Sequence, residues 1–248
     1  MLITGPAEPP KSLRKRFWQL LRRMRRPAWL GTLRRTSPIS DCWGFDRGTP
    51  IDRFYIDGFV AAHRSDIRGA VLEVQNRMYS LRYGSDVERS EVLDIDSTNP
   101  EATIIADLAQ ADSIASDQFD CFILTQTLQL IRDTHACIVH AHRILRPGGV
   151  LLVTVPFLSR MIPAYDGPSD YWRFTTDSCS ELFSEVFGSD AIEVNSHGNI
   201  LAAIAYLTGM AQEELTRREL EVYDKYFPVT ISVRAVKQAA AGSSSANA

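Results

Sequence analysis

The chain has 248 residues, of which 45% are hydrophobic and 23% charged, a balance typical of a soluble globular protein with one large domain and an extension. Its net charge of −3 hides an asymmetry, because residues 11–35 carry ten Lys or Arg and no acid, whereas residues 36–248 carry 17 bases and 29 acids. No stretch approaches the roughly 18 apolar residues of a membrane span, and the N-terminus lacks the apolar run of a signal peptide. The four cysteines form no C-x-x-C pair, so the sequence predicts no metal site and favours the reducing cytoplasm.

Residues 1–35 are predicted to form a basic N-terminal extension. Within KSLRKRFWQLLRRMRR at 11–26, apolar residues recur at helical spacing until Pro27 ends the pattern. A helix of this kind can lie on an anionic membrane or contact a partner enzyme, and it can equally dock on the acidic body of the chain or stay solvated. Nucleic acid is the less favoured partner. The first alternative would place the protein at the inner face of the cell membrane.

The rest of the chain divides into a polar lead-in segment, an α/β domain and a tail. The lead-in covers residues 36–68 and includes a short predicted helix at 54–63, and the low-complexity tail at 239–248 is predicted to be disordered. Between them, residues 69–238 alternate apolar strands with helical patterns. The strands are expected at 71–74, 91–95, 103–108, 119–126, 150–156, 191–194 and 229–236, and the helices at 134–145, 176–187 and 199–222.

Such alternation predicts a doubly wound, mostly parallel sheet, whose ligands bind at the carboxyl ends of the strands. Acids stand at or near the ends of three successive predicted strands: Glu73, then Asp94 or Asp96, then Asp107. An acid at the end of the second strand can accept both hydroxyls of a ribose, and an acid after the third can accept the amino group of an adenine. Since turns also favour Asp and Glu, it is the register of the three acids that favours a nucleoside ligand.

Two further stretches carry a family resemblance. DQFDCFILTQTLQLI at 117–131 and HRILRPGGVLLVTVP at 142–156 resemble the second half of S-adenosylmethionine-dependent methyltransferases of the type 11 class, and the likeness covers roughly residues 69–188. It implies the Rossmann-like class I methyltransferase fold with an antiparallel last strand, and S-adenosyl-L-methionine as cofactor. DYWRFT at 170–175 is similar to a subgroup found alongside glycosyltransferases, which implies O-methylation of a saccharide or glycolipid precursor.

The resemblance also implies roles for individual residues. Glu73 and Asn76 would lie by the methionine part of the cofactor, Asp94 or Asp96 would hold the ribose, Asp107 and Leu108 would lie at the adenine, and Gln126 and Thr127 would lie near the transferring methyl group. The family pattern after the first strand is typically E-x-G-x-G-x-G, but here Gln75, Asn76 and Arg77 stand where glycines would be expected, and the next glycine is Gly84. Binding of the methionine end must therefore use another loop shape, or be weak or lost.

For chemistry on a hydroxyl acceptor, a base with a pKa near neutral is useful. The candidates are Asp166 and Asp170 in the loop after the fifth long strand, and His197 after a later one. Each also has a structural interpretation, as a turn cap, a solvated loop residue or a packed histidine. Two alternatives to a saccharide methyltransferase stay open, namely a non-catalytic methyltransferase-like binding domain and an enzyme that methylates a small metabolite. The sequence does not specify the oligomeric state.

Overall fold

The computed structural model describes residues 24, 31–162 and 169–239. Two compact units are present, residues 1–37 and residues 38–248, and the second contains the sheet. The predicted basic helix at 11–26 lies outside the described residues, apart from Met24. Within the described part of the chain, no helix is long and apolar enough to cross a membrane.

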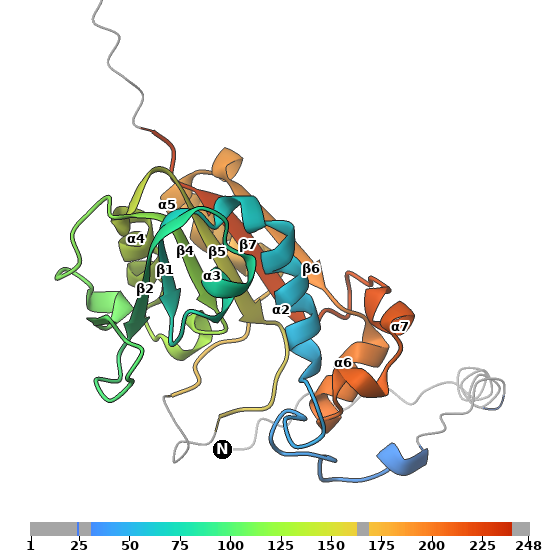
Figure 1. Cartoon of the computed structure of the whole chain (residues 1–248). Coiled ribbons are helices and arrows are strands. Elements are labelled where there is room, and N and C mark those ends of the chain that lie inside the picture. Colours follow the sequence, from blue (N-terminus) through green and yellow to red (C-terminus); the bar gives the residue numbers. More distant parts are fainter. Residues whose placement is uncertain (1–23, 25–30, 163–168, 240–248) are drawn as a thin grey trace, which may run out of the picture. The chain divides into compact units, whose positions relative to one another are not determined.

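The centre of the second unit is a seven-stranded sheet in the order β3-β2-β1-β4-β5-β7-β6 (Figure 1). The strands are β1 (Gly69–Val74), β2 (Val87–Asp94), β3 (Ile104–Ile105), β4 (Phe119–Thr125), β5 (Leu145–Pro156), β6 (Ile192–His197) and β7 (Thr230–Val236). Strands β1 to β5 pair in parallel, and β7 runs antiparallel to both of its neighbours. The predicted doubly wound sheet with an antiparallel last strand is therefore confirmed.

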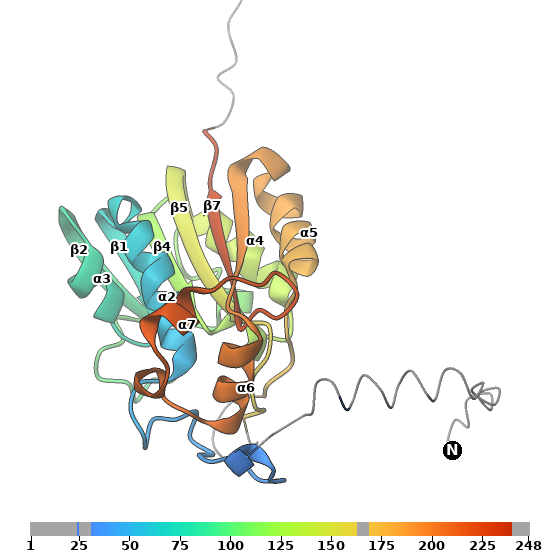
Figure 2. The ribbon, with the colours of Figure 1, turned by 90° about the vertical axis from the view of Figure 1, so that its right-hand side faces the viewer.

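Helices cover both faces of this sheet (Figures 1 and 2). The helices α2 (Ile51–Ala62) and α3 (Met78–Tyr83) pack on one face, and α4 (Thr134–Ile144) and α5 (Thr176–Phe187) pack on the other. Strand β4 shows why the sequence has no polar alternation here: Cys121 and Ile123 face α2, whereas Phe122 and Leu124 face α4 and α5. A strand buried on both faces reads as a continuous apolar run.

Two predicted boundaries were wrong. The expected helix at 199–222 is divided into α6 (Ile200–Thr208) and α7 (Arg217–Glu221), because Gly209 takes a left-handed conformation with φ +77° and ends α6. The backbone carbonyl of Ser40 lies 2.1 Å from where a Cβ of residue 209 would be, so only glycine fits. The R-P-G-G turn was expected to precede the fifth long strand, but it lies within β5, which begins at Leu145.

The lead-in segment contributes α2 to the body of the domain. Ile56, Phe59 and Val60 are buried against strand residues such as Val71 and Ile123. The helix begins after Pro50, a residue that favours helix starts. Because α2 lies along the sheet, its first turn comes to the same end of the sheet as the carboxyl ends of β4 and β5.

Candidate functional site

The loop after β1 uses its backbone donors within the chain. The buried carboxylate of Glu73 accepts hydrogen bonds from the N–H groups of Tyr79 (2.8 Å) and Ser80 (2.9 Å) at the start of α3. Burial raises the pKa of Glu73, and these two hydrogen bonds oppose that rise. Asn76 Oδ1 accepts from the N–H of Met78 at 3.1 Å. Glu73 therefore organises the loop from inside.

With Glu73 at the glutamate of the E-x-G-x-G-x-G pattern, the three glycine positions fall on Gln75, Arg77 and Tyr79, and these residues differ from one another. Gln75 keeps a positive φ of 69°, the conformation that a glycine would supply, and its side chain is exposed. Arg77 precedes α3 with φ −101°, which any residue can adopt. Tyr79 is 2% exposed and packs with α2, and its hydroxyl accepts a hydrogen bond from Arg53 Nη1 at 3.1 Å. Only the first position still has a glycine-like backbone, and the third has become part of the core.

Asp94 ends β2 at the predicted position, and its carboxylate already has partners in the chain. Asn99 Nδ2 donates to Asp94 Oδ2 (2.6 Å) and to the carbonyl of Gln75 (2.7 Å), and the N–H of Asp96 donates to Asp94 Oδ1 (3.0 Å). Asp96 instead caps the turn at Thr98, and these hydrogen bonds lower its pKa. Of the two candidates, Asp94 is the one that lies beside the β1 loop.

The remaining cofactor candidates also lie after strands. Asp107 follows β3 and accepts from the N–H of Ala109 (2.9 Å), and the adjacent Leu108 is buried. Gln126 follows β4 with a positive φ of 48°, and its Nε2 is buried without a hydrogen-bond partner in the described residues. Thr127 directs its hydroxyl to the carbonyl of Thr125. Gln126 thus has a free donor at the point where the sequence predicted contact with the cofactor.

A cavity of about 190 Å³, here called the strand-end cavity, opens beyond β4 and β5. It is lined by α2, by the segments after β4 and β5, and by α6; its residues are Trp43, Phe45, Pro50, Asp52, Arg53, Gln126, Gln129, Pro156, Ser159, Arg160, Ile162, Asp170, Arg173 and Tyr206. Three buried polar atoms that lack a partner among the described residues belong to lining residues: Asp52 Oδ1, Gln126 Nε2 and Gln129 Oε1. Buried polar atoms are rarely left unpaired, so this concentration makes the strand-end cavity the candidate binding site.

Asp52 is the buried acid of this cavity. It lies in the first turn of α2, and its Oδ2 accepts from the Tyr206 hydroxyl at 3.3 Å. Burial raises the pKa of the carboxyl, whereas the charge of Arg53 and the hydrogen bond from Tyr206 oppose that rise. An acid with a raised pKa in a cavity is a candidate for proton transfer.

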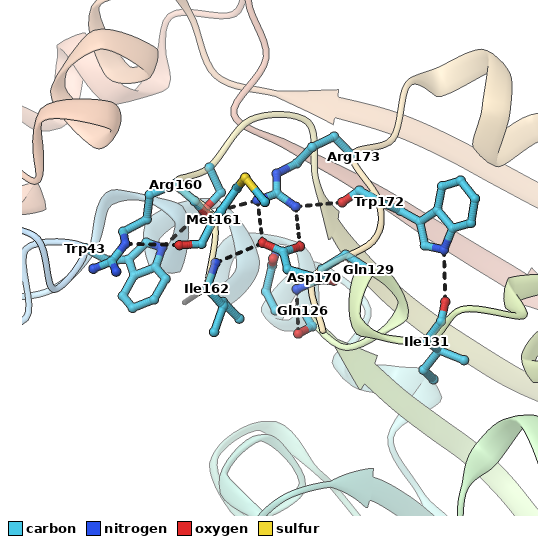
Figure 3. Close-up of polar contacts among 11 residues, drawn as sticks. Trp43, Gln126, Gln129, Ile131, Arg160, Met161, Ile162, Asp170, Trp172 and Arg173 are labelled. Atoms are coloured by element: carbon cyan, nitrogen blue, oxygen red, sulfur yellow. Dashed lines mark hydrogen bonds and ion pairs between the residues drawn. The ribbon is translucent and has the colours of Figure 1, made fainter. Parts of the chain in front are cut away.

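The predicted acid Asp170 has a structural role at the rim of the cavity (Figure 3). Its carboxylate accepts from both terminal nitrogens of Arg173 and from the N–H of Ile162 (3.1 Å), and the hydrogen bond from Arg173 lowers the pKa of Asp170. This pairing makes Asp170 a poor proton acceptor. Asp166, the other predicted acid of the loop, lies outside the described residues.

The aromatic cluster at 171–174 divides between core and surface. Phe174 is buried, whereas Tyr171 and Trp172 are 47% and 42% exposed. Trp172 donates its indole N–H to the carbonyl of Ile131, as Figure 3 shows. On the opposite side of the cavity, the Arg160 guanidinium lies 4.3 Å from the ring centroid of Trp43.

His197 is not part of the strand-end cavity. It lines a second cavity of about 670 Å³ together with His63, between α2, β6 and α7. Its Nε2 is 2.7 Å from the Ser232 hydroxyl, and burial lowers its pKa. The structure therefore separates His197 from Asp170 and Gln126. In the described residues, no group of His, Cys, Asp and Glu is arranged to hold a metal ion.

Sequence reasoning missed Asp52, Arg53, Gln129 and Tyr206. Asp52 and Arg53 lie in the lead-in segment, which carries no strand–helix alternation, and Pro50 was the only local sign of a helix start. Gln129 lies three residues after Gln126 in the loop that was expected to face a ligand. Tyr206 lies in an apolar run, where nothing distinguishes it from a core residue.

Comparisons with known proteins agree with this architecture. Residues 68–153 match the family model of the type 11 methyltransferase domain. No curated protein matches the chain. Among solved structures, a Galdieria sulphuraria protein named for sarcosine dimethylglycine methyltransferase activity has a TM-score of 0.50 at 12% identity, with 76% of this chain and 90% of that chain covered. The complex of the Haloferax volcanii Trm112 activator with its candidate methyltransferase also gives 0.50, at 16% identity and 76% and 92% coverage.

These structural similarities are too distant in sequence to show more than the fold. The family match covers β1 to β4 and most of β5. It includes Glu73, Asp94, Asp107 and Gln126, which lie at or near the carboxyl ends of their strands. The chain therefore has the class I methyltransferase fold, and its residues 68–153 are similar to a methyltransferase domain.

Proposed function

We propose that the protein catalyses methyl transfer from S-adenosylmethionine to a hydroxyl oxygen of a small polar acceptor bound in the strand-end cavity. One observation carries this proposal: the unpartnered polar atoms of Asp52, Gln126 and Gln129 are buried around the same cavity, beyond the carboxyl end of the sheet. Ligands of doubly wound sheets bind at that end.

The cofactor fits the nucleoside half of the site. Asp94 would hold the ribose, Asp107 and Leu108 would lie at the adenine, and Gln126 would lie towards the acceptor. The positive φ of Gln75 keeps the first turn of the β1 loop open in the way that a glycine does. When it is bound, S-adenosylmethionine supplies an electrophilic methyl group on a sulfonium.

The residues of the chain can prepare the acceptor. Asp52 can accept the proton of an acceptor hydroxyl, because burial raises its pKa towards the range where a carboxylate is a useful base. Gln126 Nε2 can donate to a hydroxyl oxygen, and Gln129 Oε1 can accept from another hydroxyl. Since these groups would position the acceptor, orientation accounts for much of the expected rate enhancement.

As the acceptor we propose a saccharide. Both hydrogen-bond donors and acceptors line the cavity, and each hydroxyl of a sugar can donate or accept a hydrogen bond. The resemblance of DYWRFT to methyltransferases found alongside glycosyltransferases also supports a saccharide or glycolipid precursor. For a glycolipid, the four exposed apolar residues of α6, namely Ile200, Leu201, Ile204 and Leu207, offer a surface for membrane contact at the cytoplasmic face.

A second candidate function is a non-catalytic binding domain. The contacts that favour it are those of Asn99, which already bonds both Asp94 and the Gln75 carbonyl, and the burial of Tyr79 at a glycine position. If these contacts hold the site closed, the fold would bind a partner or another ligand without methyl transfer. Cofactor binding separates the two candidates.

The test is isothermal titration calorimetry with S-adenosylmethionine and S-adenosylhomocysteine. We expect binding to the wild-type chain, and a loss of about 10- to 100-fold in affinity for Asp94→Ala, because a carboxylate that accepts two ribose hydroxyls contributes about 1.5–3 kcal/mol. Asp190→Ala is the matched control, since Asp190 lies outside the carboxyl-end loops. An absence of binding at millimolar ligand would refute the enzyme hypothesis.

A further inference from the structure

Most backbone N–H groups of the β1 loop are bonded within the chain, so few are free to bind the carboxylate of a ligand. Anions bind readily to free N–H groups at a helix start or in a glycine-rich turn. Here the N–H groups of Tyr79 and Ser80 are bonded to Glu73, that of Met78 to Asn76, and that of Gln75 to the carbonyl of Leu93. The N–H of Asn76 donates to the carbonyl of Val74. Of the N–H groups at residues 75–80, only that of Arg77 has no partner among the described residues. One backbone donor is little for a carboxylate, so a methionine carboxylate at this loop needs a side-chain cation as well.

Three arginines line the strand-end cavity, and two of them are already engaged. Arg173 forms an ion pair with Asp170 and also donates to the carbonyls of Arg160 and Trp172. Arg160 lies over the ring of Trp43 (Figure 3). Both guanidinium groups therefore have other partners.

Arg53 has the required position and free donors. Its Nη1 donates to the hydroxyl of Tyr79, the residue at the third glycine position, and its side chain also lines the cavity with Gln126. Within the described residues, this is the only hydrogen bond that its guanidinium makes. Arg53 thus reaches both Tyr79, which follows the β1 loop, and the cavity at the end of β4 that Gln126 lines, and its other guanidinium nitrogens have no partner in the described residues.

We propose that Arg53 binds the α-carboxylate of the cofactor's methionine part, in place of the backbone N–H groups that the β1 loop no longer offers. This inference rests on the proposed function, because it concerns how the same cofactor is held. An arginine fork matches a carboxylate with two parallel hydrogen bonds, and the half-buried location reduces the competition from water. Arg53 of α2 would then supply the hydrogen bonds that a glycine-rich loop supplies through its backbone.

The test compares two ligands that differ only in this carboxylate. The affinity of S-adenosylhomocysteine and of its decarboxylated analogue S-adenosyl-3-thiopropylamine is measured by calorimetry. We expect the wild-type chain to bind S-adenosylhomocysteine at least tenfold more tightly. Arg53→Gln should weaken S-adenosylhomocysteine by about 10- to 100-fold and leave the analogue within threefold, while Arg53→Lys should retain part of the preference.

Two control variants distinguish binding from structural support. Tyr79→Phe removes the hydroxyl that Arg53 contacts but keeps the guanidinium, and Arg77→Gln removes the other arginine of the loop; both should keep the preference for the carboxylate. The inference is overturned if Arg53→Gln weakens both ligands equally, if Arg77→Gln abolishes the preference, or if the wild-type chain has no preference. Failure of the wild-type chain to bind either ligand would instead overturn the proposed function together with this inference.

Discussion

Substituting glycine at each of the three altered positions of the β1 loop should give three different changes in stability. The positions are Gln75, Arg77 and Tyr79. If the side chains at these positions contributed nothing to stability, substituting glycine would change the free energy of unfolding by similar small amounts at all three. The structure predicts that only the first two substitutions are tolerated.

The magnitudes follow from the local geometry. Tyr79→Gly removes a 2%-exposed ring from the core and places glycine in α3, which should cost about 4–6 kcal/mol, since large-to-small aromatic substitutions cost about 3–5 and a helical glycine about 1. Gln75→Gly relieves a left-handed conformation worth about 1–2 kcal/mol but adds about 0.5–1 kcal/mol of backbone entropy to the unfolded chain. The net effect is neutral or stabilising by up to about 1.5 kcal/mol. Arg77→Gly should cost at most about 1 kcal/mol, as glycine is tolerated at the residue before a helix.

Urea unfolding followed by far-UV circular dichroism gives the three free energies of unfolding. Tyr79→Phe serves as the matched control, because it keeps the ring and removes only the contact with Arg53; its cost should be about 1 kcal/mol. A cost of less than 2 kcal/mol for Tyr79→Gly, or a cost for Gln75→Gly that equals it, would refute our reading of the loop.

Three further predictions concern proton transfer, pH and membrane contact. Asp52→Asn should keep cofactor affinity in calorimetry but lower the transfer of a labelled methyl group at least 100-fold. Transfer by the wild-type chain should fall at acidic pH, because the pKa of Asp52 is raised and its protonated form cannot accept a proton. Equal transfer by the variant and the wild-type chain would contradict the role of Asp52 as a base. Because the pKa of His197 is lowered in the folded protein, the unfolded chain takes up this proton first as the pH falls. The free energy of unfolding should therefore fall as pH drops below about 6.5, and His197→Gln should weaken that dependence. An unchanged urea midpoint from pH 7.5 to pH 5 would exclude this contribution of His197. A Leu201→Glu and Leu207→Glu double variant should float less with anionic vesicles than the wild-type chain does. Equal flotation of this variant would exclude membrane contact through α6. Equal flotation of a chain lacking residues 1–35 would exclude membrane contact through the N-terminal extension.

The fold could be predicted because its signals are local and repeated. Each buried strand of the parallel part has a continuous apolar run, and each is followed by a turn or helix pattern, so the strand–helix alternation needs no knowledge of long-range contacts. The boundaries that failed depend on such contacts. Gly209 ends α6 because its backbone meets that of Ser40, which is 169 residues earlier in the chain.

The candidate site could be predicted only in part, for the same reason. The acids Glu73, Asp94 and Asp107 lie at or near the carboxyl ends of their strands, so strand order alone places them at one end of the sheet. Asp52 and Arg53 reach that end only because α2 packs across the sheet, and no periodicity in the lead-in segment indicates such packing. His197 shows the opposite case, since a titratable residue near a strand end can face a different cavity.

The missing glycines can now be explained by what replaces them. Glycines in such a loop give a ligand access to the backbone N–H groups, and that access has little use once most of these groups are bonded within the chain, two of them to Glu73. Tyr79 fills the space at the third position, and its hydroxyl accepts one hydrogen bond from Arg53. Restoring the glycines alone would not restore an anion site, because Glu73 would still accept from two of the donors. The methionine end of the cofactor therefore depends on the side chain of Arg53, and the loop can vary in sequence as long as α2 keeps that arginine in place.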